Sequence, residues 1–371
     1  MTFGSIANRK GRSGKLIPTL PYQVSGGGYP GNGITDISIN KTNGDNPGSL
    51  HTIFFKNPAT ANYTFSTTAD LSASILIVSG GGGGGYSVIN NTGPGYITNP
   101  ISGLGWIAAQ GGGGGGGNVV VYDSCGGKIT TISKNSTFSI NIGAGGIAAT
   151  GTSKAGRGLS SYITCSSGNI LSSTGTSICY PGTNLSAPNN GSDGCGNIII
   201  KYTTNPAQVF NLCNGGVAGG GAGGAGGNAG CTFNQTDSSQ KTFSSINGLS
   251  GNGTGGAGGN SIGGNATTNG GSGVYAPTSG GGGGPSGATG GNGRFSGTSS
   301  SWSSTFTNGT YCTFMNKTYG MGGRPSNVNT AIFPSQNSGD GGSSWTPAVA
   351  PSNSNGASGV VIIQVTIPQP A

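Results

Sequence analysis

The chain has 371 residues, of which 82 are Gly, whereas only 6% are charged and none is Glu. Ordinary domains contain roughly 7% Gly and about 25% charged residues, and Gly costs about 1 kcal/mol relative to Ala inside a helix. We therefore expect no helical fold and no single large aliphatic core, and the composition is far from that of an average enzyme. The formal net charge of +8 arises because seven Asp stand against fifteen Lys and Arg.

A cluster of basic residues lies near the N-terminus, at Arg9, Lys10, Arg12 and Lys15. Such a basic arm could contact an acidic protein neighbour, an anionic membrane or nucleic acid, or it could simply be solvated. Four positive charges bind a polyanion only weakly at physiological salt. No aromatic residue lies among them to stack on bases. We therefore expect assembly contacts with other proteins from these four residues and no nucleic-acid partner.

Short strands are expected next. Pro and Gly in "LIPTLPYQVSGGGYPGNG" indicate turns, and "HTIFFKN" indicates a strand. "ANYTFSTTADLSASILIVSGGGGGG" predicts two strands joined by a turn near Asp70, the second of which enters the glycine run 80–85. Further strands are expected at Asn118 to Asp123, Lys128 to Ser133 and Thr137 to Ile142.

Three regions follow from this pattern: a basic arm with a leading strand (1–60), a glycine-rich β unit (61–205) and glycine-rich layers with a closing strand (206–371). "GCGNIIIKYTT" ends the second region, and "SGVVIIQVTIPQP" ends the third. The two closing strands predict either one long sandwich whose final strand returns to the start or two successive glycine-rich units. The sequence does not separate these alternatives.

The glycine runs have two interpretations. A flexible spacer is usually a polar mixture of Gly and Ser, whereas these runs adjoin apolar strands and are interrupted by Val, Ala, Cys, Trp and Tyr. Glycine can form an extended threefold helix that packs against copies of itself, because it has no Cβ. We therefore expect an all-β sandwich with polyglycine-II-like helices between short strands, and disordered glycine loops are the alternative.

The order of these segments resembles the glycine-rich domain of virion proteins. The segments that carry the resemblance are "YTFSTTADLSASILIVSGGGGGG", "GGGGGGGNVVVYDSCGGKITTISKNSTFSINIGAGG" and the final "GVVIIQV". Members of that family are tail-fibre and tail-tip adhesins of bacteriophages and structural proteins of large DNA viruses. This chain has "STTADLSAS" where the phage pattern has a Pro-Ala-Gly turn, which favours a capsid-associated protein over an adhesin.

Catalytic and metal-binding patterns are weak. "RKGRSGKL" departs twice from the phosphate-binding loop, with Arg9 and Leu16 at the deviating positions. A hydrolytic triad would need the single His51 with an Asp such as Asp70, and nothing in the spacing singles out such a set. The seven Cys never form Cys-x-x-Cys, so buried thiols are a simpler explanation than a zinc site. We expect no enzyme activity, no catalytic residues, no cofactor and no metal.

Two functions therefore remain. In the first, the chain is a minor capsid protein of a large DNA virus that ties neighbouring capsid subunits, with the major capsid protein as its partner. In the second, it is a bacteriophage tail adhesin among tail components that binds a host surface receptor. Its receptor-loop candidates are Trp106, Tyr275, Trp302, Tyr311 and Tyr319, although these aromatic residues could instead cap the glycine layers. Either function predicts a virion protein made in the host cytoplasm, because no signal-peptide or membrane-spanning run is present.

Overall fold

The structure is a computed structural model that describes residues 20–26, 36–58, 62–84, 114–122, 130–148, 156–187, 309–323, 334–343 and 354–369. Strands β13 to β20 are described for their backbone alone. Within this part of the chain the secondary structure consists of several mainly antiparallel β-sheets and contains no α-helix. The all-β class expected from the composition is confirmed.

The first sheet, sheet I, has five antiparallel strands in the order β1-β4-β8-β9-β12. They are β1 (Tyr22–Ser25), β4 (Tyr63–Thr67), β8 (Thr137–Asn141), β9 (Ser161–Ser167) and β12 (Asn184–Ala187). Buried and partly exposed residues alternate along β4 and β8, which is the period of a strand with one face on a core. Strand β1 corrects the expectation of turns in "LIPTLPYQVSGGG", because it pairs with β4 over its whole length.

The second sheet, sheet II, has the order β11-β10-β7-β5-β23-β3-β2, and β6 also pairs with β5. Its strands are β2 (Ile37–Thr42), β3 (Leu50–Lys56), β5 (Leu71–Val78), β6 (Val119–Tyr122), β7 (Thr130–Ile132), β10 (Ile170–Leu171), β11 (Ser177–Cys179) and β23 (Val360–Thr366). The final strand β23 lies between β3 and β5. It therefore returns to the start of the chain, as the first of the two alternative arrangements predicts.

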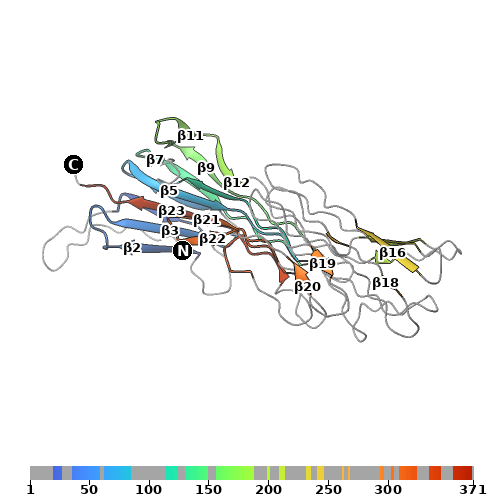
Figure 1. Cartoon of the computed structure of the whole chain (residues 1–371). Helices are drawn as coiled ribbons and strands as arrows, with labels where there is room; N and C mark the ends of the chain where they lie inside the picture. The colour runs from blue at the N-terminus through green and yellow to red at the C-terminus, as the bar shows by residue number, and fades with distance from the viewer. Residues whose placement is uncertain are drawn as a thin grey trace.

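The two sheets pack face to face and enclose one hydrophobic core (Figure 1). Its aromatic centre is a stack in which the ring centroid of Phe65 lies 5.7 Å from that of Tyr22 and 6.3 Å from that of Phe138. Burying one such side chain contributes about 1.5–3 kcal/mol. The expectation that the chain forms no single large aliphatic core is wrong for the sandwich, because short apolar clusters from many strands converge on one interior that also contains aromatic residues.

A smaller cluster covers the outer face of sheet II. The hairpin of β21 (Thr310–Cys312) and β22 (Lys317–Tyr319) turns at Asn316, whose φ is 50°. Its Cys312 and Tyr319 pack with the outward residues Leu76, Val119 and Ile362 of sheet II. Sheet II is thus apolar on both faces over the strand ends that lead into glycine.

The backbone-only strands form two further ladders. The first has the order β13-β14-β15-β16-β18 and comprises β13 (Ile199–Ile200), β14 (Val209–Cys213), β15 (Cys231–Asn234), β16 (Gln240–Ser245) and β18 (Ala266–Thr267). The second has the order β17-β19-β20 and comprises β17 (Ser261–Ile262), β19 (Gly293–Phe295) and β20 (Trp302–Ser304). The strand expected in "GCGNIIIKYTT" corresponds to the short β13.

Candidate functional site: a block of packed glycine segments

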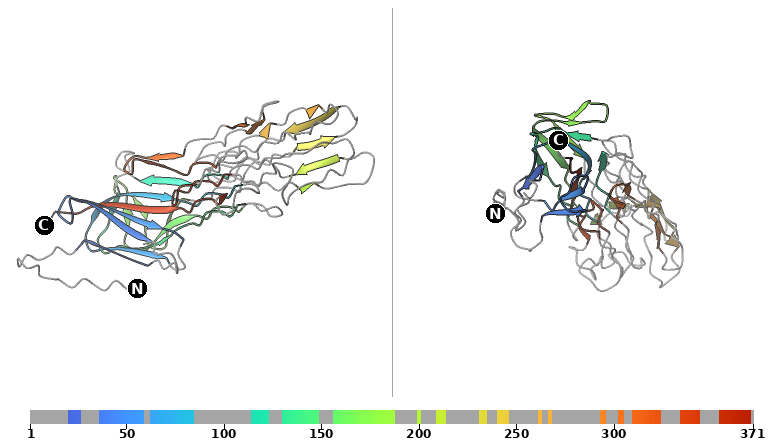
Figure 2. Two further views of the ribbon diagram at one scale, coloured as in Figure 1. Left: turned by 90° about the horizontal axis from the view of Figure 1, so that it is seen from below. Right: turned by 90° about the vertical axis from the view of Figure 1, so that its left-hand side faces the viewer.

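The sandwich strands continue into a set of glycine-rich segments at one end of the sandwich (Figure 2). We call this set the glycine block and define it as residues 79–84, 114–118, 143–148, 156–159, 320–323, 338–343 and 354–359. Segment 79–84 follows β5, 143–148 follows β8, and 354–359 leads into β23. Because strands from both sheets end at this place, the fold brings together segments that are far apart in the sequence.

Backbone hydrogen bonds join the segments of the block. Residues 79–84 bond to five other segments, and each of the five amides from Gly80 to Gly84 donates to a carbonyl 2.8–2.9 Å away. The acceptors are, in order, the carbonyls of Leu159, Ala357, Gly115, Gly156 and Ser354. Buried backbone groups must be paired, and here neighbouring segments provide the partners that a sheet would otherwise supply.

The bonds recur with a step of three residues. Gly80 and Gly83 donate to Leu159 and Gly156 of one segment, whereas Gly81 and Gly84 donate to Ala357 and Ser354 of another. Non-glycine residues follow the same step, as at Ala144 and Ile147 in segment 143–148. Successive amides of segment 79–84 therefore face different neighbours, unlike those of a flat two-residue ladder.

Glycine is required in the block because there is no room for a side chain. A Cβ on Gly80 would lie 2.0 Å from the carbonyl oxygen of Ala144, and one on Gly83 would lie 2.1 Å from that of Ile147. On Gly84 the distance to the Ser343 oxygen would be 1.8 Å. All of these neighbours are backbone atoms, and none of the three glycines has a positive φ. The requirement is therefore close approach and not an unusual backbone conformation.

One carboxyl group is buried in the block. Asp340 is 3% exposed, and its Oδ1 accepts a hydrogen bond from the Met321 amide at 2.9 Å. Burial raises the pKa of Asp340, and hydrogen bonds, including one from the Ser338 side chain, oppose this shift. This carboxyl links segment 338–343 to segment 320–323.

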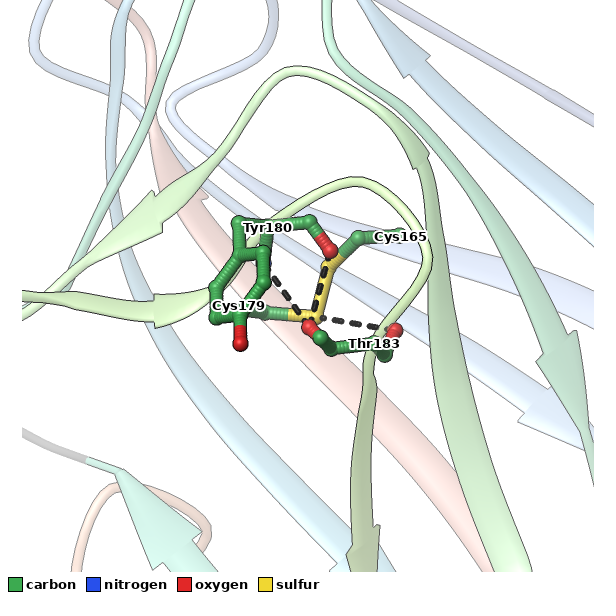
Figure 3. The surroundings of a disulfide bond; sticks show 4 residues. All are labelled: Cys165, Cys179, Tyr180 and Thr183. Atoms are coloured by element: carbon green, nitrogen blue, oxygen red, sulfur yellow. Dashed lines mark hydrogen bonds between the residues drawn. A yellow bond between two sulfur atoms is a disulfide. The ribbon is translucent and has the colours of Figure 1, made fainter.

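A disulfide joins the two sheets in the sandwich (Figure 3). Cys165 of β9 in sheet I is bonded to Cys179 of β11 in sheet II, and both residues are fully buried. The turn after Cys179 is closed by bonds between Tyr180 and Thr183, including the Thr183 hydroxyl donating to the Tyr180 carbonyl at 2.8 Å. The expectation of buried thiols is wrong for this pair, whereas Cys312 is buried and is not part of a disulfide.

The single His51 is fully buried and has partners within the fold. Its Nδ1 lies 2.7 Å from the Tyr22 hydroxyl, and its Nε2 lies 2.7 Å from the Gly44 carbonyl oxygen, which can only accept. Nε2 therefore donates a hydrogen bond to this carbonyl. Burial, with a smaller contribution from Asp45, raises the pKa of Tyr22. Asp70 instead accepts from the Lys134 amide at 2.6 Å, so the hypothetical pairing of His51 with Asp70 does not occur.

The predicted contact residues are only partly described. Arg9, Lys10, Arg12 and Lys15 lie outside the described residues, as do Trp106 and Tyr275. Trp302 lies in β20, of which only the backbone is described. Tyr311 is 55% exposed, whereas Tyr319 is 2% exposed in the cluster over sheet II. Tyr319 is therefore a packing residue, because the two-residue period of the hairpin turns it inward.

Comparisons with known proteins add no relative. No protein-family model matches the sequence, and a search of curated proteins found no match. In the part of the chain that the structure describes, no group of three His, Cys, Asp or Glu residues could hold a metal ion. The same residues include no helix long and apolar enough to span a membrane.

Proposed function

We infer that this chain is a non-enzymatic structural protein of a virus particle, a minor capsid protein of a large DNA virus that ties neighbouring capsid subunits. The glycine block is the observation that carries the proposal. It consists of closely packed backbone held by inter-segment hydrogen bonds, which suits a stiff spacer between partners. The order of strands and glycine runs resembles that of virion proteins, and this resemblance is the reason for proposing a virus particle as the location.

The proposal includes polyglycine-II-like helices in the block. This conformation has three residues per turn, no internal hydrogen bonds and lateral backbone bonding. The step of three between Gly80 and Gly83, and between Gly81 and Gly84, supports it. An experimental structure should give φ near −75° and ψ near +145° in these residues. Values typical of a flat antiparallel sheet would contradict this part of the proposal.

Quantitative mass spectrometry of purified particles from the source tests the location. We expect this chain in many copies, in a fixed ratio to the major shell protein. Absence from purified particles would refute the virion assignment. Replacing Arg9, Lys10, Arg12 and Lys15 together by Gln should reduce incorporation if the basic arm contacts capsid subunits, and unchanged incorporation would argue against that contact.

The second candidate, a tail adhesin, draws support from Tyr311. Its side chain is 55% exposed, and its hydroxyl bonds to Asn316 at the tip of the β21–β22 hairpin. Binding residues are often placed on loops that a rigid frame holds in position. The same particle analysis separates the two functions, because an adhesin would be present in few copies and confined to one tip.

A further inference from the structure

A short hairpin at the edge of sheet II is held to that sheet by few backbone pairs. It contains β10 and β11, and we define it as residues 168–179 and call it the edge flap. Strand β11 is the outermost strand of sheet II. Strand β10 pairs with β7 at two residues only, Ile170 and Leu171, and its register with β11 shifts between the same two residues. Because an isolated hairpin is only marginally stable, this pairing holds the flap weakly.

The edge flap nevertheless closes part of the sandwich core. Ile170 is 1% exposed and belongs to the hydrophobic core, and Ile178 packs against that core. Residues 173–177, at the tip of the hairpin, are exposed. The flap therefore contributes a few apolar side chains to the interior while its tip faces solvent, and opening it would bring apolar surface into contact with water.

The disulfide fastens the end of the edge flap to sheet I. Cys179 is the last residue of the flap, and it is bonded to Cys165 of β9 (Figure 3). The chain beyond the flap is also held there, because the Gly182 amide donates to the Cys165 carbonyl at 3.0 Å. Glycines with positive φ lie at both boundaries, Gly168 at 72° and Gly182 at 86°. Such residues allow the backbone changes that a hinge requires.

We propose that Cys165 and Cys179 form a redox latch on the edge flap. With the bond intact, the flap is fixed to sheet I. After reduction, the short pairing with β7 and the burial of Ile170 hold it in place, and the flap opens while the rest of the sandwich stays folded. The cytosol keeps thiols reduced and extracellular surroundings are oxidising, so the flap is loose in the first and closed in the second. This inference goes beyond the proposed virion role and does not depend on it.

The reductant is a dithiol. One of its thiolates attacks a sulfur of the disulfide, which breaks the S–S bond and forms a mixed disulfide, and its second thiol then displaces the protein sulfur. The dithiol leaves as a disulfide, and Cys165 and Cys179 together take up two electrons and two protons. Both cysteines are fully buried, and attack requires access to a sulfur. Reduction therefore follows a transient opening of the flap and needs prolonged contact with the reductant.

The test is amide hydrogen exchange of the purified full chain, read by mass spectrometry of peptides before and after reduction with dithiothreitol. The double variant Cys165→Ala, Cys179→Ala is measured without reductant, because it removes this bond and leaves every other cysteine unchanged. Peptides from β4, β5 and β23 report on the rest of the sandwich. Alkylation of the reduced wild type by iodoacetamide is a second readout. Its internal control is Cys312, which is also fully buried and is not part of a disulfide.

We expect residues 168–179 to exchange at least about tenfold faster in the reduced wild type and in the double variant than in the oxidised wild type. In the reduced protein, peptides from β4, β5 and β23 should remain at least about tenfold slower than the flap. Cys179 should also be alkylated at least about tenfold faster than Cys312, since alkylation requires exposure of the thiol.

Three results would overturn the inference. The first is flap exchange that reduction leaves unchanged. The second is exchange of the flap and the sandwich strands at one common rate after reduction, which would show that the flap opens only when the whole fold unfolds. The third is alkylation of Cys179 as slow as that of Cys312. If the double variant does not fold, the oxidised and reduced wild type still provide all three comparisons.

Discussion

The sandwich and the glycine block use the same chain segments in opposite ways. In the sandwich, side chains such as Phe65 and Phe138 fill the space between two sheets. In the block, a few residues further along the same strands, backbone fills the space and side chains are excluded. The change occurs at Ser79, directly after β5. A β-strand can therefore pass from side-chain packing to backbone packing without a separate domain. This requires the neighbouring strands to become glycine-rich at the same end of the sandwich.

The largest expected loss of stability comes from a substitution in the core of the sandwich. Phe138→Ala should lower the free energy of unfolding by about 3–5 kcal/mol, because a fully buried aromatic ring leaves a cavity. Chemical denaturation measures this loss. A loss below about 1 kcal/mol would mean that the core collapses around the gap and that the sandwich is less tightly packed than the comparison requires.

Removing the disulfide tests the link between the sheets. Replacing Cys165 and Cys179 together by Ala should cost about 3 kcal/mol in oxidising buffer, because the bond closes a loop with a sequence separation of 14. The reduced wild type is the control and should resemble the variant. If oxidised wild type and variant unfold at the same denaturant concentration, the bond does not stabilise the sandwich.

Adding one methyl group at Gly83 tests whether the segments of the glycine block are closely packed. Gly83→Ala should cost about 2–3 kcal/mol, because its Cβ would meet the Ile147 backbone at 2.1 Å and the backbone cannot move away alone. Ile147→Ala is the matched control on the neighbouring segment. Its side chain is 71% exposed, so the change should stay within about 0.5 kcal/mol. Equal effects of the two substitutions would show that residues 79–84 are not packed.

The smallest effect concerns the buried carboxyl of the block. The pKa of Asp340 is raised by burial, so the folded state binds the proton more tightly than the unfolded state. Its contribution to stability is therefore greatest in acid and declines as the pH rises through the folded pKa. Asp340→Asn should raise the unfolding midpoint slightly at neutral pH and lose that advantage near pH 3. A lower midpoint at neutral pH would show that the charged form is the stabilising one.

Much of the sandwich could be predicted from its sequence pattern. Alternation in "YTFST" and the apolar runs "LSASILIV" and "VVIIQVT" mark β4, β5 and β23 because side-chain burial follows the strand period. In the described residues, the glycine run 80–84 could be recognised as packed from the apolar strand that precedes it. Strand β1 was missed because the turn signals of its Pro and Gly neighbours outweighed a strand of only four residues.

The sequence did not predict which glycine segments bond to each other or which cysteines form the disulfide. A glycine segment has no side-chain pattern that selects its neighbour, so nothing in "SGGGGGG" indicates that Gly84 would bond to Ser354. The same limit applied to the cysteines, since spacing alone does not identify Cys165 and Cys179 as a pair. The difference between exposed Tyr311 and buried Tyr319 depends on hairpin register, and both lie in one polar, aromatic stretch.

The position of β23 has a consequence for the time at which the protein can fold. Sheet II is closed at its centre by a strand near the end of the sequence, and the side chain of Gln364 bonds to that of Thr52 across 312 residues. During synthesis, β3 and β5 must therefore wait with unpaired edges until the ribosome has released residue 366. We expect slow folding dominated by distant contacts, and a nascent chain that needs protection from aggregation over most of its translation.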